Sequence, residues 1–227
     1  GQTELGYIPL GSSNDLARGL ELPSDPEKAL FSILNAPARP VDIGCVRYGG
    51  RTRRFIVSSG FGFDASVCHQ VMVSRLKPLL NRLHLGKLTY AGVALQLLFF
   101  LRPQNMQMIL DGQEKISFHG VYFAAAMNLP FEGGGFKFCP HADCRDGKLN
   151  IIVVSGLSKL KVLLLLPTAF FGLHTRFHGV HTYTCHSAEF LSAAELPVHT
   201  DGEPVLRQQR MMVRLENEKL LMKIINK

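Results

Sequence analysis

Three Asp-Gly pairs, at positions 111–112, 146–147 and 201–202, punctuate a chain in which short apolar runs follow one another from residue 41 onward. Asp-Gly is a strong short-range signal for a two-residue hairpin turn, because both residues tolerate the positive φ angles that such a turn needs. The β-rich runs beside these turns are 41–48, 55–59, 106–110, 121–126, 149–154, 182–184 and 188–191. This pattern predicts a mainly antiparallel β-domain, built as a two-sheet sandwich or in a barrel-like form.

Two helical patterns interrupt these strands. Apolar residues recur on one helical face between 64 and 82, and residues 90–102 are apolar over most of a helical circumference. Helices of this kind either pack on a sheet or present Leu and Phe side chains to an apolar substrate or a membrane surface. The sequence leaves both interpretations open.

The first 38 residues are organised differently. An apolar run at 5–10 leads into Gly11-Ser12-Ser13-Asn14-Asp15, and helix-like segments follow at 16–20 and 26–34. One strand and two short helices cannot cover both faces of an α/β sheet. We therefore predict an α+β fold with three parts: residues 1–38 as the remnant of an N-terminal α/β domain, 39–208 as a β-rich domain, and 209–227 as C-terminal strands. A return of these strands to the N-terminal sheet is open.

The charge and cysteine content exclude several classes of protein. Lys and Arg exceed Asp and Glu by 25 to 18, so the surface attracts anions, but no basic stripe of the nucleic-acid-binding type is present. Five cysteines, an odd number without a CxxC pair, argue against a disulfide framework and for a reducing compartment. The segment Cys139–Cys144 lacks a second ligand pair at zinc-site spacing, so we do not expect zinc.

The longest apolar stretches, 91–101 and 162–173, are shorter than the roughly 20 residues that span a bilayer. No signal-peptide pattern opens the chain. We therefore expect a soluble, cytoplasmic protein, and peripheral contact with the inner face of the membrane stays open.

Four segments carry residues suited to chemistry. Gly11–Asp15 lies where a strand ends and a helix begins, which suits anion binding, although a helix N-cap is the simpler explanation. The second segment is Asn128 followed by Gly133-Gly134-Gly135, where three glycines indicate a sharp bend or the close approach of a ligand.

The other two segments contain paired carboxylates. Asp143 to Lys148 offers oxygen ligands for a hard cation, and a solvated hairpin turn explains it as well. Asp201-Gly202-Glu203 places two carboxylates across a tight turn, which suits proton abstraction or metal organisation. A plain turn is again the simpler alternative.

Taken together and in this order, the segments resemble the diacylglycerol kinase-like lipid kinases, in particular the bacterial type. The matching residues are Pro9–Arg18, Gly60-Phe61-Gly62-Phe63-Asp64-Ala65, Asn128 with Gly133-Gly134-Gly135, Pro140 with Ala142 and Asp146-Gly147, and Asp201-Gly202-Glu203. The resemblance implies an N-terminal nucleotide-binding domain related to phosphofructokinase and NAD kinase, and a β-rich domain that forms the lipid-facing cleft. It also implies transfer of the γ-phosphoryl group of ATP to a hydroxyl of diacylglycerol or a related lipid alcohol, with Mg²⁺.

The same resemblance implies residue roles. Glu203 would be the general base, with Asp201 beside it. The nucleotide would bind at Gly11, Ser12, Ser13, Asn14 and Asp15, with Ser12 in place of a nucleotide-contacting threonine. The substrate side of the cleft would include Asp64, Asn128, Gly133, Gly134 and Gly135, where Asp64 either joins a charge network or caps a helix. An auxiliary magnesium would bind the Asp146 side chain and the backbone oxygens of Asp143 and Lys148.

The sequence departs from the family in one respect. The family's Gly-Gly-Asp-Gly-Thr loop, which cradles the nucleotide phosphates, does not occur in these 227 residues. The resemblance therefore implies a fragment that lacks roughly the first quarter to third of a kinase, and we expect this fragment to be nearly inactive. The alternatives are a kinase of the same superfamily with a soluble acceptor such as NAD, and a non-catalytic lipid-binding β-domain. A homodimer is open.

Overall fold

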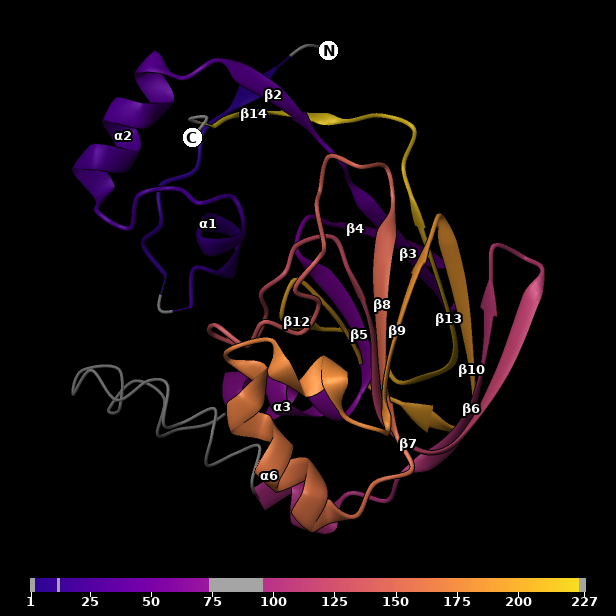
Figure 1. Cartoon of the computed structure of the whole chain (residues 1–227). Helices are drawn as coiled ribbons and strands as arrows, with labels where there is room; N and C mark the ends of the chain where they lie inside the picture. Colours follow the sequence, from indigo (N-terminus) through magenta and orange to yellow (C-terminus); the bar gives the residue numbers. More distant parts are fainter. Residues whose placement is uncertain (1–2, 12, 74–95, 225–227) are drawn as a thin grey trace.

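The β-rich runs predicted from residue 41 onward form strands in a computed structural model that describes residues 3–11, 13–73 and 96–224. The runs at 41–48 and 55–59 are each interrupted, at 42–43 and 56–57. The strands are β2 (Ala38–Val41), β3 (Gly44–Tyr48), β4 (Arg51–Phe55), β5 (Ser58–Gly62), β6 (Gln104–Leu110), β7 (Glu114–Met127), β8 (Leu149–Ser155), β9 (Val180–Cys185), β10 (Ser187–Leu196), β11 (Val198–Thr200), β12 (Glu203–Pro204), β13 (Gln208–Leu215) and β14 (Leu220–Lys223). All of them except β2 and β14 join one large antiparallel sheet (Figure 1).

The large sheet curls because β7 changes partners along its length. The first half of β7 pairs with β6, and the second half pairs with β5 on one edge and β8 on the other. Gly120, with φ of 61°, lies where the partners change, and the register shifts beside it. The curl encloses a core of large apolar side chains that includes Phe55, Phe61, Met108 and Phe190. The predicted α+β class with a sandwich-like or barrel-like β-domain is confirmed.

Two of the Asp-Gly pairs form the predicted hairpin turns. Asp111-Gly112 joins β6 to β7 and Asp201-Gly202 joins β11 to β12, with positive φ at both residues of each pair. Asp146-Gly147 differs, because only Gly147 has a positive φ and the pair ends the long connection between β7 and β8. The hairpin interpretation of this pair is therefore wrong, since its two neighbouring strands are not joined directly by it.

Helices cover one face of the curled sheet (Figure 1). They are α3 (Phe63–Val73), a short helix at 96–100, α6 (Lys159–Ala169) and the 3₁₀ helix η1 (Leu173–Arg176). The helices predicted over 64–82 and 90–102 are confirmed for 64–73 and 96–100. Residues 74–82 and 90–95 lie outside the described residues, and residues 101–102 are not helical. Their inner side chains pack with Phe123, Ile152 and Val154 in a second core. No helix in the described ranges is long and apolar enough to cross a membrane.

The N-terminal segment contributes β1 (Glu4–Leu5), α1 (Asp15–Gly19) and α2 (Pro26–Asn35). Strand β14 pairs parallel with β1 and antiparallel with β2, so the end of the chain completes a separate three-stranded sheet beside the N-terminus (Figure 1). The preceding strand, β13, belongs to the large sheet. The division into domains at residues 38 and 208 stays a prediction. All five cysteines are free thiols, as expected.

Candidate active site

A cleft of about 480 Å³ lies where the N-terminal segment meets the large sheet. Four stretches of sequence line it together with Cys68 of α3: the loop at 7–16, the β4–β5 connection at 56–58, the pair Glu132-Gly133, and the turn at 201–203. The cleft therefore joins the loop predicted to bind nucleotide to the turn predicted to carry the base.

The two carboxylates of the Asp201-Gly202-Glu203 turn have different surroundings. Asp201 accepts hydrogen bonds from three backbone amides, those of Ile56 at 2.9 Å, Val57 at 2.8 Å and Ser58 at 3.0 Å. Its carboxylate therefore fixes the start of β5. The Glu203 side chain is 66% exposed, and its Oε2 lies 2.9 Å from Nη2 of Arg53. Of the two, Glu203 has the carboxylate that a substrate can reach.

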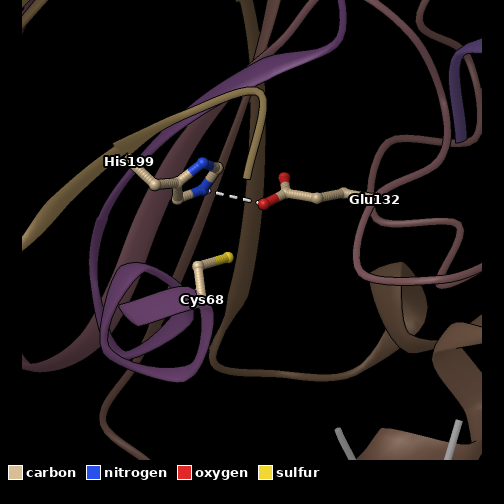
Figure 2. A group of neighbouring side chains, drawn as sticks. All are labelled: Cys68, Glu132 and His199. Carbon is tan, nitrogen blue, oxygen red and sulfur yellow. Dashed lines mark ion pairs between the residues drawn. The ribbon is translucent and has the colours of Figure 1, made fainter. Parts of the chain in front are cut away.

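A buried cluster lies behind this turn. His199 is fully buried, and its Nε2 lies 2.8 Å from Glu132 Oε1 and 3.1 Å from Asp64 Oδ2. Figure 2 shows the His199 ring facing the Glu132 carboxylate, with the Cys68 thiol beside them. The register of β11 against β5 places His199 opposite Gly60. A side chain at Gly60 would put its Cβ 1.8 Å from Asp64 Oδ2, so only glycine leaves room for the cluster.

The cluster retains protons. Burial raises the pKa of Asp64, while Glu132 and Asp64 outweigh the effect of burial on His199 and hold its pKa well above 6.5. The amide of Gly202 donates to His199 Nδ1 at 3.2 Å, so in the neutral ring Nδ1 is an acceptor and Nε2 carries the proton. The same bond ties the protonation of His199 to the turn that carries Glu203.

Cys68, Glu132 and His199 also have ligand atoms within 4.8 Å of one another, which raises the question of a metal. Burial raises the pKa of the Cys68 thiol to about 12, which disfavours the thiolate that binds zinc. A metal on Nε2 of His199 would move the ring proton to Nδ1, where the Gly202 amide already points. The arrangement fits a proton-sharing cluster better than a metal centre.

The predicted nucleotide loop is folded around Asn14 and Asp15. Asn14 has a left-handed conformation, and its Oδ1 accepts the Gly11 amide at 2.9 Å. Asp15 pairs with Arg18 at 2.8 Å and accepts the Gly134 amide at 2.8 Å, and burial raises its pKa. Ser12 lies outside the described residues. Because α1 has only five residues, phosphate binding here cannot depend on a helix dipole and stays a prediction.

The three consecutive glycines are explained by backbone conformation and by a close approach within the chain. Gly133, Gly134 and Gly135 have φ of 68°, 87° and 115°, and they form the loop of a small hairpin closed between Glu132 and Phe136. A Cβ at Gly135 would lie 2.9 Å from Nη1 of Arg18. The glycines let this hairpin bend sharply and meet α1, and the hairpin in turn carries Glu132 into the cleft.

Asn128 is not among the described residues that line the cleft. It is fully buried, and its Nδ2 donates to the carbonyl oxygens of Asp42 and Ile56, both at 2.9 Å. The amide thus holds two loops together beneath the cleft.

The predicted magnesium ligands form an exposed turn away from the cleft lining. Asp143 Oδ1 lies 3.1 Å from Nε of Arg145, and Asp146 Oδ1 accepts the Lys148 amide at 2.9 Å. The Asp146 carboxylate is thus engaged within the turn, the backbone oxygen of Asp143 accepts the Asp146 amide at 3.3 Å, and the Arg145 guanidinium lies beside Asp143, which is a poor fit for Mg²⁺. The auxiliary magnesium site stays a prediction, and no step proposed below depends on it.

The sequence interpretation assigned no role to His199, Glu132 or Cys68. His199 lies two residues before Asp201, and Glu132 lies directly before the three glycines, so both were adjacent to recognised segments. Asp64, for which a charge network and a helix cap were both open, belongs to the network.

Comparison with known proteins identifies the family of the chain. Residues 56–217 match the YegS C-terminal NAD kinase beta sandwich-like domain, and residues 1–46 match the diacylglycerol kinase catalytic domain. The fold is thus a β-sandwich of the NAD kinase-like class, joined to part of a kinase catalytic domain. The chain belongs to the diacylglycerol kinase-like lipid kinase family, as its motifs indicated.

Individual relatives are similar over most of this chain. The diacylglycerol kinase of Mycobacterium tuberculosis strain H37Rv is 30% identical over 203 residues, which cover 88% of this chain and 62% of the relative. The diacylglycerol kinase of Bacillus subtilis strain 168 is 28% identical over 201 residues, with 88% and 62% covered. The chain spans about two thirds or less of the length of the curated relatives that it matches.

The crystal structure of a diacylglycerol kinase from Bacillus anthracis strain Sterne superposes with a TM-score of 0.68 at 18% identity, covering 98% of this chain and 67% of that chain. This similarity supports the fold alone.

Proposed function

We propose that the protein transfers the γ-phosphoryl group of ATP to the hydroxyl of diacylglycerol or a related lipid alcohol, with Glu203 as the general base. The observation that carries this proposal is the cleft, which joins the loop at 11–15 to the accessible carboxylate of Glu203. The names of the relatives, diacylglycerol kinases and lipid kinases, support the same chemistry.

The reaction needs one base and one site that holds the phosphates. The acceptor hydroxyl oxygen attacks the γ-phosphorus of ATP. The bond between the γ-phosphorus and the bridging oxygen breaks, ADP leaves with that oxygen, and Glu203 takes the hydroxyl proton. Arg53 holds the Glu203 carboxylate in place, and Asp201 fixes the turn. Gly11, Ser13 and Asn14 line the cleft and would face the phosphates. Mg²⁺ bound with ATP would neutralise phosphate charge.

A soluble acceptor such as NAD is the second candidate, because the matched domain is described as NAD kinase-like. If the acceptor is soluble, the apolar stretches at 90–102 and 162–173 should be buried in a closed core. Phe99, Phe100 and Leu164 are instead 64 to 80% exposed, which supports an apolar acceptor.

The test is to offer labelled ATP and Mg²⁺ to the full-length gene product with diacylglycerol in mixed micelles, with NAD, or with no acceptor. We expect label in the lipid. Label in NAD alone would contradict the lipid assignment and favour the second candidate.

A further inference from the structure

One surface of the molecule gathers large apolar side chains that nothing in the described part of the chain covers. It is formed by the helix at 96–100, by α6 and by the η1 segment that follows, and we call it the α6 surface. Its most exposed members are 48 to 80% accessible: Phe99, Phe100, Leu160, Leu164, Phe171 and Phe177. In Figure 1, α6 lies on the outside of the molecule, over one face of the sheet.

Helix α6 is apolar on both sides. Val162, Leu163 and Leu165 pack against the second core. Leu160 and Leu164, one helical turn apart, point away from it and are 66% and 67% exposed. A helix that only covers a sheet carries polar residues on its outer side. The outer leucines are therefore not explained by folding.

The three segments are fixed to one another. Nζ of Lys159 donates to the carbonyl oxygen of Phe99, which joins the start of α6 to the helix at 96–100. The ring of Phe170 stacks on Phe136 with centroids 4.1 Å apart, and His174 Nε2 lies 3.1 Å from the Phe138 oxygen. The exposed side chains thus belong to one continuous, anchored surface.

The segments that form this surface carry charged side chains of a single sign. Neither residues 65–110 nor residues 147–188, which include the whole α6 surface, contain an Asp or Glu. Lys161 and Arg176 are exposed, and neither forms an ion pair with any described residue. Exposed Phe and Leu with Lys and Arg beside them, and no acid, form the pattern of helices that lie in the interface of anionic membranes.

A second exposed apolar surface, on α2, lacks this pattern. Phe31 and Leu34 are 68% and 73% exposed, but Asp25 and Glu27 lie in the same helix or at its cap. It therefore provides a contrast, because its helix carries acidic residues as well as Lys28 with its exposed apolar side chains.

The α6 surface is also connected to the cleft. The hairpin of residues 132–136 has Glu132 in the cleft lining at one end and Phe136 against Phe170 at the other. The Lys137 amide, next along the chain, donates to Ala169 of α6 at 2.8 Å. Anything that binds the α6 surface thus lies one short hairpin from the cleft.

We propose that the α6 surface docks the protein onto a bilayer that contains anionic phospholipid. Phe99, Phe100, Leu164 and Phe171 enter the interface, while Lys161 and Arg176 face the lipid phosphates. The docking rests on this surface alone. Its role, to bring the cleft to a lipid acceptor, rests on the proposed function.

The test is co-sedimentation of the 227-residue chain with vesicles of phosphatidylcholine, alone or mixed equally with phosphatidylglycerol, without ATP. We expect binding to the mixed vesicles that weakens with salt. Leu164→Ser with Phe171→Ser should reduce binding about 100-fold, and Lys161→Ala with Arg176→Ala about 30-fold. The matched variant, Phe31→Ser with Leu34→Ser, should bind like the unchanged chain. Urea unfolding of each variant checks that these exposed substitutions leave the fold intact.

No binding to mixed vesicles, or equal binding by the α6 and α2 variants, would overturn the proposal. A dimer in gel filtration that the Leu164 and Phe171 substitutions dissociate, without vesicle binding, would assign the surface to a second copy of the chain instead. Because this assay involves no phosphoryl transfer, its failure leaves the kinase proposal standing. Vesicle binding by the chain, together with no phosphorylation of any lipid by the full-length gene product, would overturn the kinase proposal alone.

Discussion

The Nε2 of the fully buried His199 lies 2.8 Å from Glu132 Oε1, and this contact joins two segments that are 67 positions apart in the sequence. This contact joins β11 to the glycine hairpin, and through the Gly202 amide on Nδ1 it reaches the turn that carries Glu203. The Oε2 of Glu132 has no hydrogen-bond partner among the described residues. The cleft wall thus depends on one buried imidazole.

Replacing His199 by Leu should destabilise the fold by about 3–5 kcal/mol, because the carboxyl groups of Glu132 and Asp64 lose their shared donor inside the protein. Urea unfolding measures the loss. His119→Leu, at an exposed position on β7, is the control and should change stability by less than about 0.5 kcal/mol. A loss for His199→Leu as small as that of the control would contradict the cluster.

The stability of the protein should fall as the pH rises above 6.5. The pKa of His199 is higher in the folded state than its usual 6.5, so between these two values the folded protein holds a proton that the unfolded chain releases. The stabilisation from protonated His199 is complete below pH 6.5, and it is lost as the pH rises past the pKa that His199 has in the folded protein. Urea midpoints across this window should decline, whereas a His199→Gln variant should give a flatter profile. Parallel profiles would exclude His199 as the titrating group.

A methyl group at Gly60 should disrupt the same cluster from the opposite side. Its Cβ would lie 1.8 Å from Asp64 Oδ2 and 2.3 Å from His199 Nε2, and neither side chain has free space to retreat into. We expect Gly60→Ala to cost about 3 kcal/mol. Gly50→Ala, at a hairpin tip with no atom within 4 Å, should cost only the strain of a positive φ, about 1–2 kcal/mol. If thermal unfolding showed the same loss of stability for Gly60→Ala and Gly50→Ala, the side chains of Asp64 and His199 would be able to move aside, which would contradict a tightly packed cluster.

Much of the fold was predictable because its signals are local. Alternating apolar residues and an Asp-Gly turn mark β6 and β7, since each signal needs only neighbours in sequence. Helix α6 was not predicted as a helix, because apolar residues on both of its sides hide the helical period. The exposed leucines on the outer side of α6 are better explained by binding to a bilayer than by packing in the core.

The candidate site was predictable only in part. The Asp201-Gly202-Glu203 turn and the glycine hairpin are contiguous in sequence, and both line the cleft. The contact of His199 with Asp64 and Glu132 instead depends on the register of β11 against β5 and on the path of the β7–β8 connection. The role of Asp201 as an acceptor for three amides is equally non-local.

The central claim is that Glu203 accepts the proton of a lipid hydroxyl during phosphoryl transfer from ATP. The most direct measurement is the turnover of diacylglycerol by the full-length protein carrying Glu203→Gln, beside Glu218→Gln, an exposed carboxylate outside the cleft lining. We predict that Glu203→Gln lowers turnover by about 100-fold or more, with an unchanged unfolding midpoint. Glu218→Gln should be as active as the unchanged protein. Equal turnover of the two variants would contradict the account and remove Glu203 from the reaction.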